Sequence, residues 1–169
     1  MRLFIGIELT PIVQEELYTL QNVWLSHALK KNPTRYDNFH LTLLFLGELD
    51  PHWIDPLIDQ LSLSLSSINT FDLTIGDVGS FVRGDKHIIW VGVKQSQPLK
   101  SVYNAVKRAV NDCEITVQDA RFTPHITLAR EVLFRQDYEI TLPFIQVSQP
   151  VTHITLFLSQ RKNGELIYT

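Results

Sequence analysis

The feature that most constrains this chain is a tripeptide that recurs inside apolar runs. His40-Leu41-Thr42 lies in the run from Phe39 to Gly47, and His125-Ile126-Thr127 lies in the run from Pro124 to Arg130. Side chains of a β-strand alternate between its two faces, so the histidine and the threonine share one face and the residue between them occupies the other. Each motif therefore predicts a strand with one polar face and one core face.

An internal repeat separates these two motifs from a third copy, which contains His153. His40 follows Gly6 by 34 residues, and His125 follows Gly92 by 33 residues. Two similar strand-helix-strand lobes, related by a pseudo-two-fold axis, would place His40 and His125 on opposite sides of one cleft. His153 lies outside the repeat, so we expect its motif to be on a neighbouring strand without a catalytic role.

The paired motifs also indicate a chemistry. In-line displacement at phosphorus needs a general base on one side and a general acid on the other, together with donors for the charged oxygens. Histidine has an unperturbed pKa of ~6.5, so one imidazole can be neutral while another is charged near pH 7. Two opposed His-x-Thr motifs therefore predict acid-base chemistry at a phosphodiester, and the residues alone do not order the two histidines.

Length and composition indicate an ordinary globular protein. The 169 residues are 44% hydrophobic and 20% charged, and we expect a single domain over residues 1–169 whose two intertwined lobes have no linker. The formal net charge of −3 excludes an overall basic field that would attract long nucleic acids. Any polynucleotide must therefore be held locally.

The single cysteine, Cys113, excludes an internal disulfide, and the sequence has no Cys/His spacing typical of zinc sites. No apolar run approaches the ~20 residues of a membrane-spanning helix. The N-terminal apolar run is short and interrupted by Glu8, unlike a signal peptide. We expect a cytoplasmic, monomeric protein with no cofactor, no bound metal, no membrane association, no segment to be removed and no obligatory protein partner.

Hydrophobic periodicity predicts the α+β class, with strands of period two and helices of period 3.6. Gly76 and Gly79 indicate a bulge or bend in one strand. The expected strands are 2–9, 39–47, 71–81, 87–93, 124–130, 140–147, 151–159 and 165–168, and the expected helices are 11–31, 52–67 and 97–113.

These motifs and their flanks resemble the 2H phosphoesterases, and within them the RNA 2′,3′-cyclic phosphodiesterases once described as 2′-5′ RNA ligases. The resemblance covers nearly the whole chain. It rests on residues 2–7, 40–48, 124–130, 156–159 and 168–169. It implies a bilobal α+β fold with antiparallel sheets lining a central cleft, and metal-independent hydrolysis of a terminal 2′,3′-cyclic phosphate of RNA to a 2′-phosphomonoester. The family generally continues past such a Tyr-Thr pair, so we assign no role to the end of the chain.

The resemblance also implies roles for four residues. His40 would be the proton donor to the departing 3′ oxygen, and His125 would be the proton acceptor that activates water. Thr42 and Thr127 would donate hydrogen bonds to the non-bridging phosphate oxygens.

Arg130 is a further candidate, because the family tends to carry an arginine near the phosphate at this position. Strict alternation puts His125, Thr127 and Ala129 on one face and Arg130 on the other. Arg130 can reach the phosphate if the strand bulges or ends, or from the rim of the cleft. Otherwise it is a surface arginine.

Four aromatic residues are candidates for stacking a terminal base at the cleft mouth, as single-stranded RNA ends are often bound. Core packing is the alternative role for most of them. They are Tyr36, Phe39, Phe81 and Phe122.

Other functions stay open at this point. The substrate could be a small cyclic phosphate, such as an ADP-ribose cyclic phosphate, or a 2′,5′-linked oligonucleotide instead of an RNA 3′ end. The chain could also bind phosphorylated RNA ends without chemistry. A metal site is the weakest alternative, because neither motif includes a carboxylate ligand.

Overall fold

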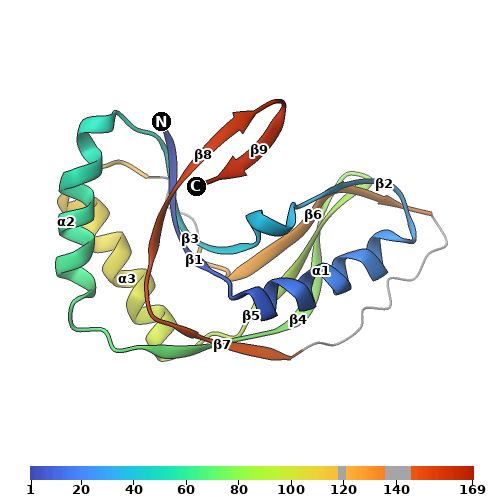
Figure 1. Ribbon diagram of the computed structural model, residues 1–169, viewed down its shortest axis with the longest axis horizontal. Coiled ribbons are helices and arrows are strands. Elements are labelled where there is room, and N and C mark those ends of the chain that lie inside the picture. Colours follow the sequence, from blue (N-terminus) through green and yellow to red (C-terminus); the bar gives the residue numbers. More distant parts are fainter. Residues whose placement is uncertain (118–120, 136–145) are drawn as a thin grey trace.

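The computed structural model describes residues 1–117, 121–135 and 146–169, which form two antiparallel sheets and three α-helices (Figure 1). The first sheet has the strand order β3 (His40–Glu48), β1 (Arg2–Glu8), β8 (Thr155–Lys162), β9 (Glu165–Tyr168). The second has the order β2 (Ala28–Pro33), β6 (His125–Phe134), β5 (Lys86–Val93), β4 (Phe71–Arg83), β7 (Val147–Val151). The predicted α+β class with antiparallel sheets is confirmed.

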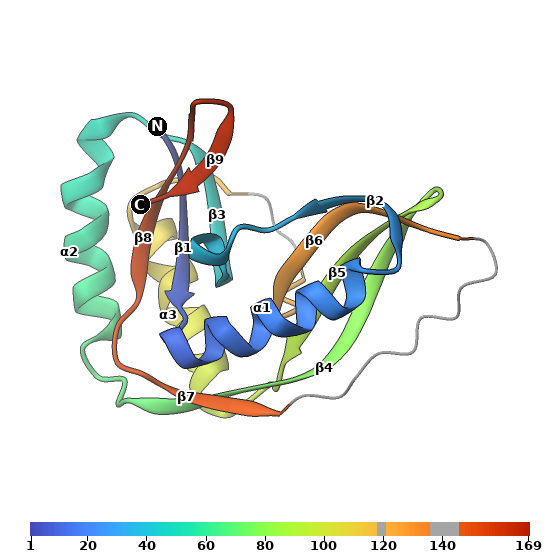
Figure 2. The ribbon, with the colours of Figure 1, turned by 45° about the vertical axis from the view of Figure 1, so that its right-hand side comes forward.

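The helices cross between the two sheets. Helix α1 (Pro11–Leu25) follows β1 of the first sheet but contacts β2 and β6 of the second, whereas α3 (Gln97–Asp112) follows β5 of the second sheet but contacts β3 of the first. Helix α2 (Ile54–Leu65) packs on α3. Each strand-helix unit therefore contributes its helix to the other sheet, and Figure 2 shows α1 on one side of the molecule and α2 with α3 on the other.

The core follows from this exchange. Strand β1 is central in the first sheet, and its residues Leu3 to Ile7 are all buried, which explains its continuous apolar run. Leu17 of α1, Leu57 of α2 and Leu99 of α3 are each at most 1% exposed and belong to one continuous hydrophobic cluster. The two halves therefore share a core, and the position of one sheet constrains the other.

One predicted helix is too long. The prediction extends the first helix to Lys31, but α1 ends at Leu25 and residues 28–33 form strand β2, which pairs with β6 at the edge of the second sheet. Lysines and a proline are typical of edge strands, and Lys30, Lys31 and Pro33 fit that use. Pairing with β6 is a long-range interaction, which local periodicity does not report.

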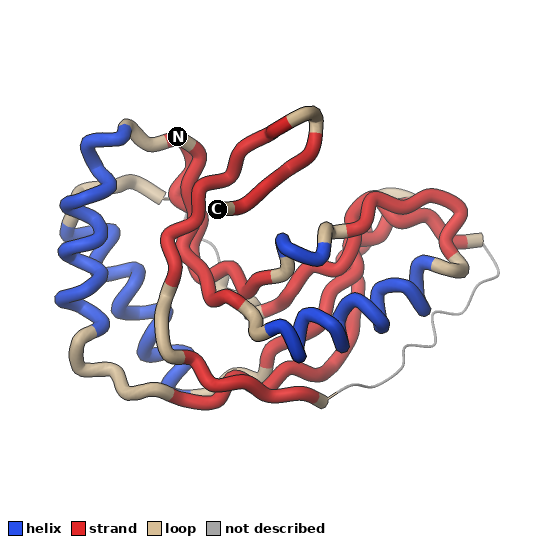
Figure 3. Tube along the Cα trace, viewed as in Figure 1, coloured by secondary structure: helices blue, strands red, loops and turns tan. Residues whose placement is uncertain are grey.

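Other predicted elements are found close to their expected bounds. Figure 3 shows the helices and strands along the chain. Two short 3₁₀ helices, η1 (Tyr36–Asn38) and η2 (Pro51–Trp53), precede β3 and α2. The bulge predicted near Gly76 is confirmed, because the β4–β5 register shifts between Gly76 and Val78 and Asp77 between them has a φ of 28°.

The C-terminal strands differ from the prediction. The predicted strand at 140–147 lies mostly outside the described residues, and β7 begins at Val147. The predicted strand at 151–159 is wrong in its bounds, because β7 ends at Val151 and β8 begins at Thr155. The chain crosses here from the second sheet to the first, so His153 lies in a connection and not on a strand.

Among the helices of residues 1–117, 121–135 and 146–169, none has the length and apolar character needed to cross a membrane.

Candidate active site

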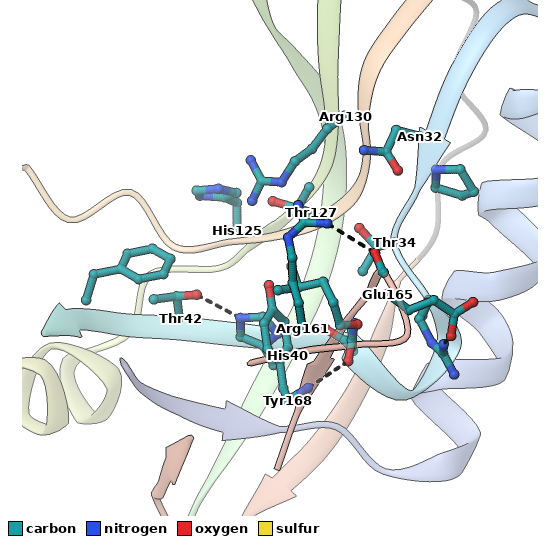
Figure 4. A pocket seen from close by; sticks show the side chains of 16 residues that line it. Asn32, Thr34, His40, Thr42, His125, Thr127, Arg130, Arg161, Glu165 and Tyr168 are labelled. Atoms are coloured by element: carbon teal, nitrogen blue, oxygen red, sulfur yellow. Dashed lines mark hydrogen bonds and ion pairs between the residues drawn. The ribbon is translucent and has the colours of Figure 1, made fainter. Parts of the chain in front are cut away.

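A cavity of about 440 Å³ lies where β3 of the first sheet approaches β6 of the second (Figure 4). Both His-x-Thr motifs contribute to its lining, so the structure brings His40, Thr42, His125 and Thr127 together. The other lining residues come from β2, the segment around η1, the rest of β3 and β6, and the β8–β9 hairpin: Asn32, Pro33, Thr34, Arg35, Asn38, Phe45, Arg130, Arg161, Gly164, Glu165, Leu166 and Tyr168.

Both histidines are fixed in the same way. Nδ1 of His40 is 2.7 Å from the carbonyl oxygen of Asn38, and Nδ1 of His125 is 2.7 Å from that of Thr123. A carbonyl oxygen can only accept, so each Nδ1 carries the hydrogen and each neutral imidazole keeps an unprotonated Nε2. His40 Nε2 lies 2.9 Å from Thr42 Oγ1, which donates to it. The two motifs therefore share one tautomer, set by the backbone two residues upstream.

The imidazole of His40 is enclosed by aromatic rings. Its ring centre is 4.7 Å from that of Phe4 and 5.0 Å from that of Tyr168, which meets it edge-on. Burial lowers the pKa of His40 from 6.5 to about 4, and the charges of Arg130 and His125 act in the same direction against the opposing hydrogen bond to the Asn38 carbonyl. His40 is therefore neutral at pH 7 in the free protein.

The imidazole of His125 has two aromatic neighbours. The ring of Phe81 lies edge-on at 5.2 Å, and that of Trp90 at 6.2 Å. Gly79 makes room for the Trp90 indole, because a Cβ at Gly79 would lie 2.4 Å from the indole ring. The glycine on β4 thus allows the packing that supports His125.

A bulge explains how Arg130 reaches the cavity. Ile89 pairs with Ala129 and the next residue, Trp90, pairs with Thr127, so Leu128 is an extra residue in β6. Leu128 and Ala129 are both buried and Arg130 after them is exposed, so the alternation is shifted by one residue at this point. The bulge turns Arg130 to the face of His125 and Thr127, which is the first of the alternatives that the sequence left open.

The same bulge occurs in the other motif. Ile5 pairs with Leu44 and Gly6 pairs with Thr42, so Leu43 is the extra residue in β3. Phe45 therefore turns into the cavity, where it is 59% exposed. It follows His40 by five residues, as Arg130 follows His125. Sequence reasoning missed Phe45, although this shared offset was a usable signal.

A buried glutamine holds the β6 bulge. Gln21 on α1 is 3% exposed, and its Nε2 donates to the carbonyl oxygens of Leu128 at 2.7 Å and Thr34 at 2.8 Å. The backbone N–H of Thr34 also donates to the Leu128 oxygen, at 2.8 Å. The helix exchanged between the lobes thus fixes the residue that redirects Arg130.

The β8–β9 hairpin borders the cavity and is attached to η1 through Asn38. The Asn38 side chain donates to the Leu166 carbonyl at 2.8 Å and accepts from the Tyr168 N–H at 3.3 Å, and Arg35 pairs with Glu165. Burial raises the pKa of Tyr168, so its hydroxyl stays protonated at neutral pH. Asn38 thus connects the hairpin to His40, because the backbone carbonyl of Asn38 accepts the hydrogen bond from His40 Nδ1.

The four aromatic residues proposed for stacking do not line the cavity. Phe39 is 2% exposed and packs in the core, so its proposed stacking role is wrong. Tyr36 lies in an adjacent hollow and contacts Tyr18, and Phe122 stacks on Tyr103. Phe81 touches His125 and is 37% exposed, so it borders the site.

The remaining histidines lie outside the cavity lining. His153 Nε2 is 3.6 Å from a carboxylate oxygen of Glu8, and Thr155 donates to the other oxygen of Glu8 at 2.9 Å. His52 pairs with Asp50 at 2.7 Å. The third His-x-Thr motif is thus engaged with β1 and separate from the cavity, as expected for His153.

No group of three or more metal-ligating His, Cys, Asp or Glu side chains is found in the part of the chain that the structure describes. Glu165 is the carboxylate in the cavity lining, and it is paired with Arg35. The lining instead presents imidazole, hydroxyl and guanidinium groups to a common space, and these groups can bind an oxyanion and move protons.

Comparison with known proteins identifies the family. Residues 14–163 match the family model of the 2′-5′ RNA ligase superfamily. A curated protein of Escherichia coli named RNA 2′,3′-cyclic phosphodiesterase is 29% identical over 171 residues, covering 99% of this chain and 92% of the relative. One of the same name from Thermotoga maritima is 25% identical over 154 residues, covering 88% of this chain and 82% of the relative.

Solved structures agree in fold. The apo form of E. coli LigT superposes with a TM-score of 0.78 at 28% identity, covering 99% of this chain and 92% of that one. LigT has also been crystallised with 3′-AMP and with phosphate. A Thermus thermophilus protein matches in fold with a TM-score of 0.80 at 24% identity, covering 100% of this chain and 94% of that one. The chain belongs to the 2′-5′ RNA ligase superfamily, the 2H phosphoesterases.

Proposed function

We propose that this protein hydrolyses the terminal 2′,3′-cyclic phosphate of RNA to a 2′-phosphomonoester, without a metal, by acid-base catalysis between His40 and His125. The observation that carries the proposal is that the two motifs open on one cavity from different sheets, each with Nδ1 bound to a carbonyl, so that the unprotonated nitrogen of each neutral imidazole is Nε2.

The reaction uses one proton transfer on each side of the phosphorus. His125 Nε2 takes a proton from water, the water oxygen bonds to phosphorus, the bond to the 3′ oxygen breaks, and His40 donates a proton to that oxygen. The assignment of donor and acceptor follows the family resemblance. Opposed imidazoles are the arrangement that in-line displacement requires.

The low pKa of His40 bears on its assignment as the proton donor. A proton donor must carry its proton when the 3′ oxygen leaves, whereas His40 is neutral at pH 7 in the free protein. A bound phosphate anion favours the imidazolium and raises the pKa of the histidine beside it. Substrate binding therefore increases the fraction of His40 that carries the proton needed for donation.

Thr42, Thr127 and Arg130 bind the phosphate oxygens in this proposal. Strand β6 and its bulge place Thr127 and Arg130 before the substrate arrives, and β3 places Thr42. The Thr42 hydroxyl donates to His40 Nε2 in the free protein and becomes available to the phosphate when His40 takes up a proton. Preorganised donors stabilise the charge that builds up on the oxygens in the transition state. The guanidinium supplies a positive charge at the place where a metal ion would otherwise be needed.

The relatives support the reaction class. Curated members that this chain resembles over most of its length carry the name RNA 2′,3′-cyclic phosphodiesterase, and LigT binds 3′-AMP and phosphate. We therefore expect this chain to be a phosphodiesterase that acts on a nucleotide substrate.

The test is product analysis on a short RNA ending in a 2′,3′-cyclic phosphate, in parallel reactions with and without EDTA. We expect a 2′-phosphomonoester, distinguished from the 3′ isomer by chromatography against standards, at the same rate with and without EDTA. A 3′-phosphomonoester, or activity abolished by EDTA and restored by a divalent ion, would contradict the mechanism.

The same assay separates the alternatives. A cyclic mononucleotide turned over as fast as the oligomer would indicate a small-molecule phosphodiesterase. The absence of any product, together with binding that weakens in His40→Ala and His125→Ala, would indicate a module that binds phosphorylated RNA ends.

A further inference from the structure

The cavity contains an arginine that the reacting phosphate does not explain. Arg161 lies on β8, in the hairpin that borders the cavity, and belongs to neither His-x-Thr motif. Figure 4 shows its side chain extending from the hairpin into the cavity, toward the side that carries Thr127 and Arg130. The cavity therefore receives a guanidinium from each sheet.

Arg161 has spare capacity to bind an anion. Its Nη1 donates to the carbonyl oxygen of Gly164 at 3.1 Å, which holds the side chain against the hairpin turn. No carboxylate among residues 1–117, 121–135 and 146–169 forms an ion pair with Arg161, whereas Arg35, the third arginine of the lining, is paired with Glu165. A guanidinium has five N–H donors in a planar fork, so four remain for a ligand.

The charge balance points to a second anion. The reacting cyclic phosphodiester carries a single negative charge, which Arg130 already matches. An additional unpaired arginine in the same cavity adds a positive charge that repels Arg130 unless another anion binds to it. The volume of about 440 Å³ lies in the range of about 300–1,000 Å³ of small-molecule sites, so a nucleotide with more than one phosphate fits such a cavity.

We infer that Arg161 binds a second phosphate of the substrate, the one on the 5′ side of the terminal nucleoside. This inference rests on the proposed function and assigns a substrate class to the site: nucleotides that carry a 5′ phosphate group in addition to the terminal cyclic phosphate. The 5′ group is either a phosphomonoester of a single nucleotide or the phosphodiester that continues an RNA chain. Both present anionic oxygens to the guanidinium.

The first experiment measures binding and does not depend on turnover. Titration calorimetry compares a nucleoside 2′-monophosphate with the corresponding 2′,5′-bisphosphate for the wild type, Arg161→Gln and Lys162→Gln. Lys162, also a basic residue and the next along β8, is exposed and absent from the cavity lining, so it is the matched control. We expect the wild type and Lys162→Gln to prefer the bisphosphate by roughly tenfold, and Arg161→Gln to lose that preference.

The second experiment identifies the source of the phosphate. The rate constant kcat/KM is measured on three cyclic phosphates that end in the same nucleoside: one with a 5′ hydroxyl, one with a 5′ phosphate, and a dinucleotide. We expect Arg161→Gln to lower kcat/KM roughly tenfold on the substrate whose 5′ group it binds and less than twofold on the 5′-hydroxyl compound. Loss on the dinucleotide identifies an RNA chain as the ligand, and loss on the 5′-phosphate compound alone identifies a mononucleotide.

Two results would overturn the inference. An equal loss on all three substrates would place Arg161 at the reacting phosphate, and wild-type affinities and rates in Arg161→Gln would remove it from binding. Failure of the proposed function is seen separately, as the absence of turnover by the wild type on every substrate. In that case the difference in affinity between the 2′,5′-bisphosphate and the 2′-monophosphate still decides the role of Arg161.

Discussion

The two halves of the cavity use the same backbone geometry in different surroundings. In each, an extended strand carries His and Thr, a leucine bulges after the threonine, and the histidine Nδ1 donates to the carbonyl two residues upstream. The surroundings differ. Phe4 and Tyr168 enclose the imidazole of His40. Five residues after the histidine, β3 places Phe45 in the cavity, whereas β6 places Arg130 there. The two motifs thus share one backbone geometry, and the side chains around each motif determine its charge and its role.

The largest expected effect is on turnover, when either histidine of the two motifs is replaced. Replacing His40 or His125 with alanine removes a positioned acid or base, and each change should lower kcat by ~10²–10⁴-fold. The assay is hydrolysis of an RNA 2′,3′-cyclic phosphate, with circular dichroism to check folding. His153→Ala is the matched control, because His153 carries the same motif outside the cavity, and it should stay within about twofold of wild type. Wild-type rates in both site variants would refute the mechanism.

The residues that the two bulges direct into the cavity should differ strongly in importance. Arg130→Gln removes charge-assisted hydrogen bonds to the phosphate, which are worth roughly 1.5–3 kcal/mol, so kcat/KM should fall roughly 10–100-fold. Phe45→Leu removes no charge and should cost only a few-fold. Arg108→Gln, an exposed arginine on α3, serves as the control for loss of a positive charge. A larger loss for Phe45→Leu than for Arg130→Gln would contradict the assignment of the phosphate to the β6 half.

The protonation of His40 gives a pH-dependent test. Its pKa is lowered by burial to about 4, so NMR of the imidazole should show His40 neutral from pH 7 down to about pH 5 in the free protein. Adding a nucleoside 2′-monophosphate should raise that pKa by roughly 1–2 units, because the anion stabilises the imidazolium. An unchanged pKa in the complex would contradict the role of His40 as proton donor.

The repeat-related glycines provide a test of packing. A Cβ at Gly6 would lie 2.7 Å from the carbonyl oxygen of Leu41, which is backbone and cannot move aside, whereas a Cβ at Gly92 would lie 3.2 Å from the carbonyl oxygen of Asp77. Gly6→Ala should reduce the free energy of unfolding by about 1–3 kcal/mol, and Gly92→Ala by less. Urea denaturation measures both, and equal losses would show that the two lobes tolerate the extra methyl alike.

The smallest effect is expected at the threonines. Thr42 Oγ1 already donates to His40 Nε2 at 2.9 Å, and Thr42→Val or Thr127→Val removes one hydrogen bond of about 0.5–1.5 kcal/mol. Each change should lower kcat roughly 2–10-fold, with KM measured in the same assay. Losses as large as those of the histidine variants would mean that the threonines take part in proton transfer.

Much of this site could be predicted from the sequence, because the determining signals are local or repeated. Alternation places His and Thr on one face. The similar spacings, 34 residues from Gly6 to His40 and 33 from Gly92 to His125, select these two histidines over His153. Strict alternation could not place Arg130, because the bulge at Leu128 depends on Gln21, a residue 107 positions away. A bulge is fixed by tertiary hydrogen bonds, which leave little trace in local pattern.

The remaining differences have the same origin. The sequence pattern predicts that the first helix continues to Lys31, but residues 28–33 pair with β6. Phe39 is a candidate for base stacking by its position in the sequence, but its ring packs in the core. Arg161 and Tyr168 reach the cavity only because β8 and β9 form a hairpin attached to Asn38. Tertiary structure, either pairing between distant strands or packing in the core, decides all of these positions.

The most direct test of the central claim, that both motifs act on one phosphate, is the rate of the double variant His40→Ala, His125→Ala under single-turnover conditions with EDTA. Residues that act as one unit are strongly non-additive. We predict that the double variant is about as slow as the slower single variant. A loss equal to the product of the two single losses would show that the histidines act independently and would contradict this account.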